Sequence, residues 1–168
     1  MKKFGPAGNR YLKMIHIFFI SLWVGGGFAL VLLFYISNPG GGDEIYATYA
    51  AMKIIDDFII IPGAMGNLIT GLVYGIWTKW GFFKHWWVTV KWIMTVLQIL
   101  FGTFFLGPWL NNNTALADLK RIAVLKNPDF LYNNSMTGIW GPVQVAMLLV
   151  MIIISVKKPW RKLKSQKP

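Results

Sequence analysis

The chain has 168 residues, of which 55% are hydrophobic and 16% aromatic, and it carries a formal net charge of +11. This composition is too apolar for an ordinary soluble protein, and the length suits one domain covering residues 1–168. The sequence contains no cysteine, which excludes disulfides, thiolate metal sites and cysteine-based redox chemistry.

Four segments of the chain are long and apolar enough to cross a membrane, which takes about 20 mostly apolar residues. They cover residues 12–37, 54–78, 88–110 and 138–156. The first follows basic residues, as the core of a signal peptide does. Its apolar run is too long for one and has no small-residue cleavage site, so we expect this helix to be retained. The segments predict an all-α fold, an integral membrane four-helix bundle.

The connections between the predicted helices differ in length. The Gly-rich run 38–43 ends the first helix, and Asp56 with Asp57 is expected to cap the second helix at its N-terminus, where negative charge is favourable. The second outer loop, residues 111–137, is long for a mere connection. The apolar spacing over 114–125 predicts a short amphipathic helix on the outer surface, with one face formed by Leu116, Leu119, Ile122 and Ala123.

The charged residues are distributed unevenly along the chain. The N-terminal segment, the 79–87 loop and the C-terminal tail contain no acid, and all six acids lie in or beside the other two loops. Because basic segments stay in the cytoplasm during insertion, we predict that both termini are cytoplasmic. We expect no nucleic-acid partner, since no known binding module accompanies the charge. The basic residues are Lys2, Lys3, Arg10, Lys13, Lys79, Lys84, Lys157, Lys158, Arg161, Lys162, Lys164 and Lys167.

Polar residues inside the predicted helices recur at helical spacing, so each set lies on one face. Because polar groups are costly in a bilayer, these faces predict a partly polar bundle centre with interhelical hydrogen bonds. The sets are His16, Ile20, Trp23 and Gly27; Asp56, Gly63, Asn67, Thr70 and Tyr74; Lys91, Thr95 and Gln98; and Gln144, Met147, Met151 and Ser155. An interfacial aromatic belt is expected from Trp80, Phe82, Phe83, Trp86, Trp87 and Trp92.

Three basic residues near the predicted cytoplasmic side are the candidates for chemistry. His16 lies about one helical turn inside its span; neutral imidazole is a strong iron ligand, although a packing role is more common. Lys91 lies at a similar depth, where a buried amine can act as base or ligand, or can instead extend to the headgroups. His85 lies in the aromatic run, about 240° around a helix from Lys91, so those two do not share a face.

Two motifs resemble a group of small bacterial membrane proteins. The first is His16 followed by Trp23 in the run HIFFISLWVGG, and the second is WGFFKHWWVTVKW, which leads to Lys91. Both are similar to the copper-resistance-D-like group, which includes an uncharacterised four-helix membrane protein family and the four-helix haem-type protoporphyrinogen oxidase. The resemblance implies a bacterial cell membrane, with haem b near His16 and Lys91. The oxidase usually has a histidine two residues before that lysine, where this chain has Thr89.

Two classes of function fit these residues, and whether the chain is an enzyme stays open. The first is a b-type haem protein of the cytoplasmic leaflet that exchanges electrons with a quinone or a porphyrinogen-like substrate. In that class His16 is the candidate iron ligand, and His85 or Lys91 is the second ligand or a propionate partner. The second is a non-catalytic accessory subunit, or a transporter or sensor for a small solute or copper. A membrane protein partner would bind through the outer loop 111–137.

Overall fold

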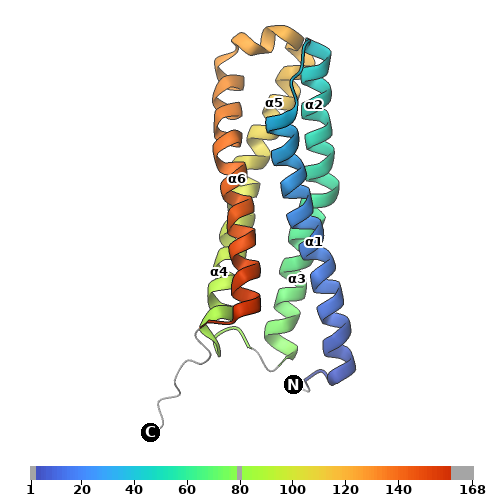
Figure 1. Ribbon diagram of the computed structural model, residues 1–168, viewed down its shortest axis with the longest axis vertical. Helices are drawn as coiled ribbons and strands as arrows, with labels where there is room; N and C mark the ends of the chain where they lie inside the picture. Colours follow the sequence, from blue (N-terminus) through green and yellow to red (C-terminus); the bar gives the residue numbers. More distant parts are fainter. Residues whose placement is uncertain (1–2, 79–80, 160–168) are drawn as a thin grey trace.

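The computed structural model describes residues 3–78 and 81–159, and every element in that part of the chain is helical. Four long helical segments run antiparallel in one bundle, with the start of the first and the end of the fourth at the same end (Figure 1). The elements are α1 (Pro6–Ile36), α2 (Gly42–Ile55), η1 (Asp56–Ile60), α3 (Ile61–Trp77), α4 (Trp86–Phe101), η2 (Gly102–Leu106), α5 (Gly107–Lys120), η3 (Arg121–Lys126) and α6 (Pro128–Lys157). The π-helical segments η1 and η2 continue their neighbours, so α2 to α3 and α4 to α5 each form one long helix, whereas a positive φ of 48° at Arg121 ends α5 before the 3-10 segment η3.

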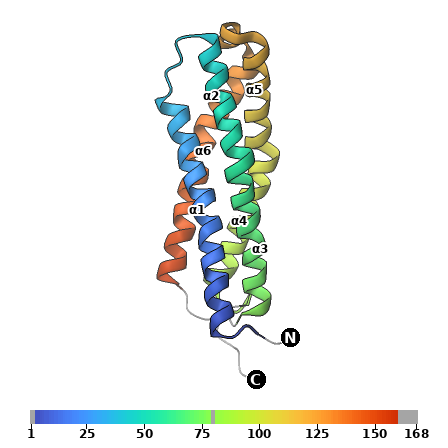
Figure 2. The same cartoon turned by 90° about the vertical axis from the view of Figure 1, so that its right-hand side faces the viewer.

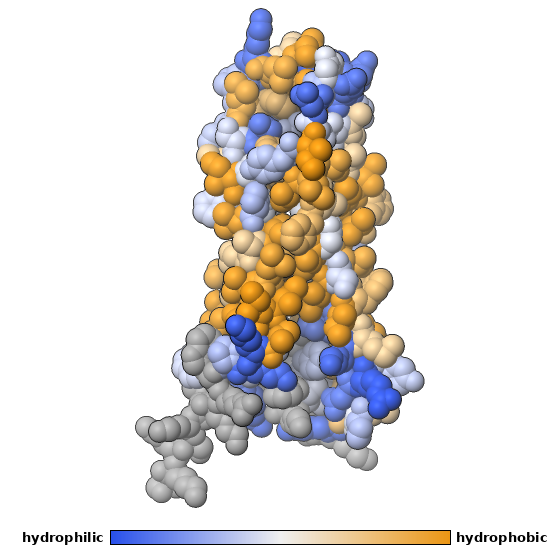
Figure 3. All heavy atoms as spheres, viewed as in Figure 1, coloured by the Kyte–Doolittle hydropathy of each residue, from blue (hydrophilic) through white to orange (hydrophobic). Residues whose placement is uncertain are grey.

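Each of the four long helices is long and apolar enough to cross a membrane. Apolar residues cover the middle of the bundle, and hydrophilic residues gather toward its two ends (Figure 3). Phe18, Phe58 and Phe104 are between 58% and 76% exposed, which is unfavourable in water and favourable in lipid. The exposed apolar surface therefore fits a lipid bilayer environment. The four predicted spans lie within these helices to within one residue.

The structure differs from the prediction over residues 111–137, where the sequence predicts an outer loop. The third long helix instead continues to Lys120, the 3-10 segment η3 follows it, and α6 begins at Pro128. At about 1.5 Å per residue, the helix from Trp86 to Lys120 extends about 50 Å, well beyond the ~30 Å hydrocarbon core of a bilayer. Figure 2 shows α1 ending well below the tops of α2 and α5. The upper parts of the other three long helices therefore form an extension beyond α1.

This helical extension has an apolar core of its own. Ala117 and Val124 are fully buried in it, whereas Leu119 is 82% and Ile122 55% exposed. The apolar face predicted over 114–125 is thus not the buried one, because α2 and the first half of α6 cover the opposite side of this segment. The core cluster consists of Ile45, Tyr49, Met52, Leu110, Ala117, Val124 and Phe130.

The two π-helical segments lie directly before prolines. Pro62 and Pro108 each occupy the second position of the helix that follows η1 or η2. Proline has no N–H, and its ring clashes with the carbonyl four residues earlier, so the turn before it widens. Asp56 and Asp57 lie in η1, in the middle of a continuous helix. The prediction that they cap a helix N-terminus is wrong; Asp43 and Glu44 occupy the first turn instead.

Glycines let α1 and α3 approach closely. A Cβ built on Gly63 would lie 2.7 Å from the backbone nitrogen of Trp23, and one on Gly26 would lie 2.7 Å from Cγ1 of Ile60. Small residues at such positions allow helices to pack closely in membranes. The close approach holds His16 of α1 against α3.

The structure describes part of the aromatic belt that the sequence predicts. Phe83 and Trp86 are 76% and 50% exposed, whereas the rings of Phe82 and Trp92 pack edge to face with centroids 5.0 Å apart. Trp80 lies outside the described residues, as do Lys2, Lys79 and the basic tail residues Arg161, Lys162, Lys164 and Lys167. The described aromatic residues therefore include both exposed rings and rings packed into the lower end of the bundle.

Candidate functional site

Hydrogen bonds join the polar faces of different helices, as the sequence predicts. The Gln98 Nε2 donates to the Gln144 carbonyl oxygen at 3.0 Å, and the Gln144 Nε2 donates to the Gln98 carbonyl oxygen at 3.2 Å. The Thr95 hydroxyl donates to the Met151 sulfur at 3.6 Å. These bonds connect α4 to α6 along the inside of the bundle. The centre of the bundle is therefore partly polar.

A cavity of about 780 Å³ lies between the four long helices, toward the end where α1 starts and α6 ends. We call it the basic cavity, because Lys13, His16, Lys91 and Lys158 line it. No aspartate or glutamate of the described chain lines it. Its walls also include the rings of Trp23, Trp87 and Trp92. Its volume falls within the range of about 300–1,000 Å³ that is typical of small-molecule and cofactor sites.

Thr70 of α3 holds the ring of His16. The Thr70 hydroxyl lies 2.7 Å from the Gly66 carbonyl oxygen, to which it can donate its single hydrogen. His16 Nδ1 lies 2.6 Å from the same hydroxyl oxygen, and when that hydroxyl donates to Gly66 the Nδ1–H is the donor in the contact. We assign the neutral His16 ring as the Nδ1–H tautomer, which leaves a lone pair on Nε2. This is how metal-binding histidines are commonly oriented by a neighbouring group.

Lys91 reaches across the bundle from α4 to α6. Its ammonium donates to the Ser155 hydroxyl, and that hydroxyl donates to the Met151 carbonyl oxygen at 2.9 Å. This contact directs the side chain toward α6. Lys91 and His16 thus line one cavity from different helices.

His85 is placed apart from the other two candidates. It is the N-cap residue of α4, where its carbonyl oxygen accepts hydrogen bonds from the amides of Val88 and Thr89. Its ring lies 6.2 Å from the Trp87 ring, and it is not among the residues that line the basic cavity. The Thr89 hydroxyl donates to the Phe82 carbonyl oxygen, so it holds the segment that leads into α4. The structure therefore brings His16 and Lys91 together without His85.

The structure adds two lysines that sequence reasoning did not select. Lys13 precedes His16 by three residues, so it occupies the same helix face, and that spacing could have identified it. Lys158 follows the last turn of α6 in a left-handed backbone conformation, and no sequence pattern marked it as part of a site. Together with Lys91 they give the basic cavity its positive charge.

A second cavity, of about 450 Å³, lies further along the bundle, away from the chain ends. We call it the acidic cavity, because Asp56 and Asp57 line it. Trp23 and Leu148 line both cavities and so lie between them. Among the residues that the structure describes, no group of three or more histidine or acidic side chains is arranged to hold a metal ion.

The chain matches no protein-family model, no curated protein and no solved structure. The fold and the cavities define a class, an all-helical protein with four helices able to span a membrane and two ligand-sized cavities of opposite charge. The choice of function within that class rests on the chemistry of the cavities.

Proposed function

We propose that the basic cavity binds haem b and that His16 is an axial ligand of its iron. The observation that carries the proposal is the position of His16 on the wall of a cavity of about 780 Å³, where its Nδ1 contacts Thr70 and its Nε2 has no hydrogen-bond partner among the described residues. Haem iron in proteins is commonly held by one neutral histidine. The pair His16 and Lys91 is also the pair that the resemblance to the copper-resistance-D-like group implies.

The other residues of the cavity suit the rest of a haem. Haem carries two carboxylates, and Lys13, Lys91 and Lys158 supply positive charge with no carboxylate of the described chain among the lining. The rings of Trp23 and Trp92 supply apolar walls. When bound, haem would supply one-electron redox chemistry, tuned by its axial ligand and surroundings.

Thr70 and Ser155 form hydrogen bonds with the two side chains proposed to bind haem, His16 and Lys91. Thr70 holds His16 in one tautomer and one orientation, so that Nε2 is presented without a change of rotamer. Ser155 fixes the Lys91 ammonium inside the bundle, where it attracts an anionic group. Both residues would therefore orient the side chains that hold the haem.

We further propose a placement in the cell membrane of a bacterium with both termini cytoplasmic, so that the basic cavity lies in the cytoplasmic leaflet. Support comes from Lys13 and Lys158 at the end with the chain termini, and from Asp43 and Asp118 at the other end. A quinone or a porphyrinogen-like substrate is the proposed electron partner. The helical extension over 111–137 exposes Leu119 and is the proposed contact for a membrane protein partner.

Absorption spectroscopy tests the haem proposal. Protein purified from haem-sufficient cells is expected to show a Soret band, and the His16→Ala variant is expected to lose most of it. His85→Ala is the matched control, since it removes the only other histidine, and it is expected to keep the band. A wild-type protein without a Soret band after reconstitution with excess haem would refute haem binding. A band unchanged in His16→Ala would refute His16 as the ligand.

A further inference from the structure

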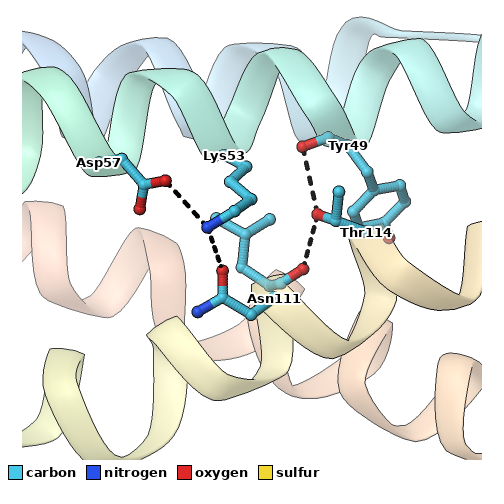
Figure 4. A network of polar contacts seen from close by, with 6 residues as sticks. Tyr49, Lys53, Asp57, Asn111 and Thr114 are labelled. Atoms are coloured by element: carbon cyan, nitrogen blue, oxygen red, sulfur yellow. Dashed lines mark hydrogen bonds and ion pairs between the residues drawn. The ribbon is translucent and has the colours of Figure 1, made fainter. Parts of the chain in front are cut away.

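Two carboxylates line the acidic cavity, and Lys53, which is not part of its described lining, forms an ion pair with only one of them. Asp57 forms an ion pair with Lys53 at 2.9 Å, and the same Lys53 ammonium donates to Asn111 at 2.7 Å (Figure 4). Asp56 makes no hydrogen bond or ion pair with the part of the chain that the structure describes. An intramembrane carboxylate is costly unless it has a partner, so Asp56 calls for a ligand that supplies one.

A buried amide oxygen in the same cavity also lacks a partner. Gln98 is 2% exposed and lines the acidic cavity. Its Nε2 donates to Gln144, but its Oε1 has no hydrogen-bond donor among the described residues. The buried Thr137 hydroxyl, also in the lining, is unpartnered in the same part of the chain. Because buried polar atoms are nearly always hydrogen-bonded, these atoms indicate a ligand that donates hydrogen bonds.

The acidic cavity lies beside the two π-helical segments of the backbone. Asp56 lies in η1, Thr103 lies in η2, and both line the cavity together with Pro142 of α6. Such π segments inside helices occur frequently at functional sites. The widened turns and the helix proline open space between the helices at one level of the bundle.

We infer that the acidic cavity binds a protonated organic amine with an apolar, preferably aromatic, body. The ammonium would pair with the Asp56 carboxylate and donate to the Gln98 Oε1, while Trp23 and Phe34 pack against the body. The volume of about 450 Å³ and the largely apolar walls suit an organic molecule better than a bare metal ion. The inference concerns a different cavity from the haem proposal and stands independently of it.

A pair of probes of nearly equal shape tests the inference on the wild-type protein. Equilibrium dialysis in detergent at pH 7 would compare 2-phenylethylamine, which is protonated, with neutral 2-phenylethanol. We expect the amine to bind at least about 30-fold more tightly, the lower end of the effect of an unpaired buried charge. Equal dissociation constants for the two probes would overturn the inference, and would show a site that accepts neutral hydrogen-bond donors.

Variants of Asp56 locate the binding. Asp56→Asn is expected to lose at least about 30-fold in affinity for 2-phenylethylamine, and Asp56→Glu to keep most of it. Asp118→Asn is the matched control, because that carboxylate pairs with Arg121 in the helical extension and does not line the cavity. Unchanged amine binding in Asp56→Asn would overturn the assignment. If Asp56→Asn fails to fold, as judged by size-exclusion chromatography, the comparison of the two probes on the wild type decides.

Discussion

Replacing Thr70 by valine tests whether the orientation of His16 creates the site. Valine has nearly the shape of threonine but no hydroxyl, so the 2.6 Å contact that holds His16 Nδ1 is lost. The ring then rotates more freely and populates both neutral tautomers. Loss of a group that orients a metal-binding histidine costs about 10–100-fold in metal affinity, which corresponds to about 1.4–2.8 kcal/mol. Thr70→Val is therefore expected to weaken haem binding by that factor.

Titration of haem into the apoprotein in detergent measures this effect through the Soret absorbance. Thr95→Val is the matched control: Thr95 lines the basic cavity, and its hydroxyl donates to the sulfur of Met151 and not to His16. Thr70→Ser keeps the hydroxyl and is expected to bind haem within a few-fold of the wild type. Equal losses in Thr70→Val and Thr95→Val would refute the reasoning, since cavity shape and not the histidine contact would then control affinity.

Two further predictions concern stability, measured as the thermal unfolding midpoint in detergent. Gly66→Ala places a Cβ 2.2 Å from the Phe19 ring and is expected to cost about 1–3 kcal/mol, whereas Gly25→Ala meets nothing within 4 Å and should keep the midpoint or raise it slightly, since alanine favours a helix more than glycine does. Asn113→Ala removes a fully buried amide that donates to the Phe130 carbonyl oxygen and is expected to cost about 1–3 kcal/mol. Asn112→Ala, at an exposed position, should have little effect, and equal midpoints for the two asparagine variants would contradict the account of the helical extension.

Sequence reasoning located the helices because apolar runs of membrane length have few other uses. It placed the starts of the second and fourth helices too late and the end of the third helix too early. At those ends the apolar runs stop but the helices continue. Asn113 lies in the predicted loop, since asparagine carries little helical signal, and Ala117 lies in the predicted helix 114–125 but off its predicted apolar face. They are helical because α2 and α6 bury one side of that segment, and burial in tertiary structure outweighs intrinsic propensity.

The sequence by itself determined the four long apolar helices and their polar faces, because periodicity and hydropathy depend only on the order of residues along one helix. The tertiary structure decided which faces meet. It placed His16 against Thr70 and Lys91 against Ser155, left His85 outside the basic cavity, and moved Asp56 from a predicted helix end to the wall of a second cavity. Such contacts depend on close approach between helices, which single-residue features such as Gly63 permit and which no periodicity within one helix records.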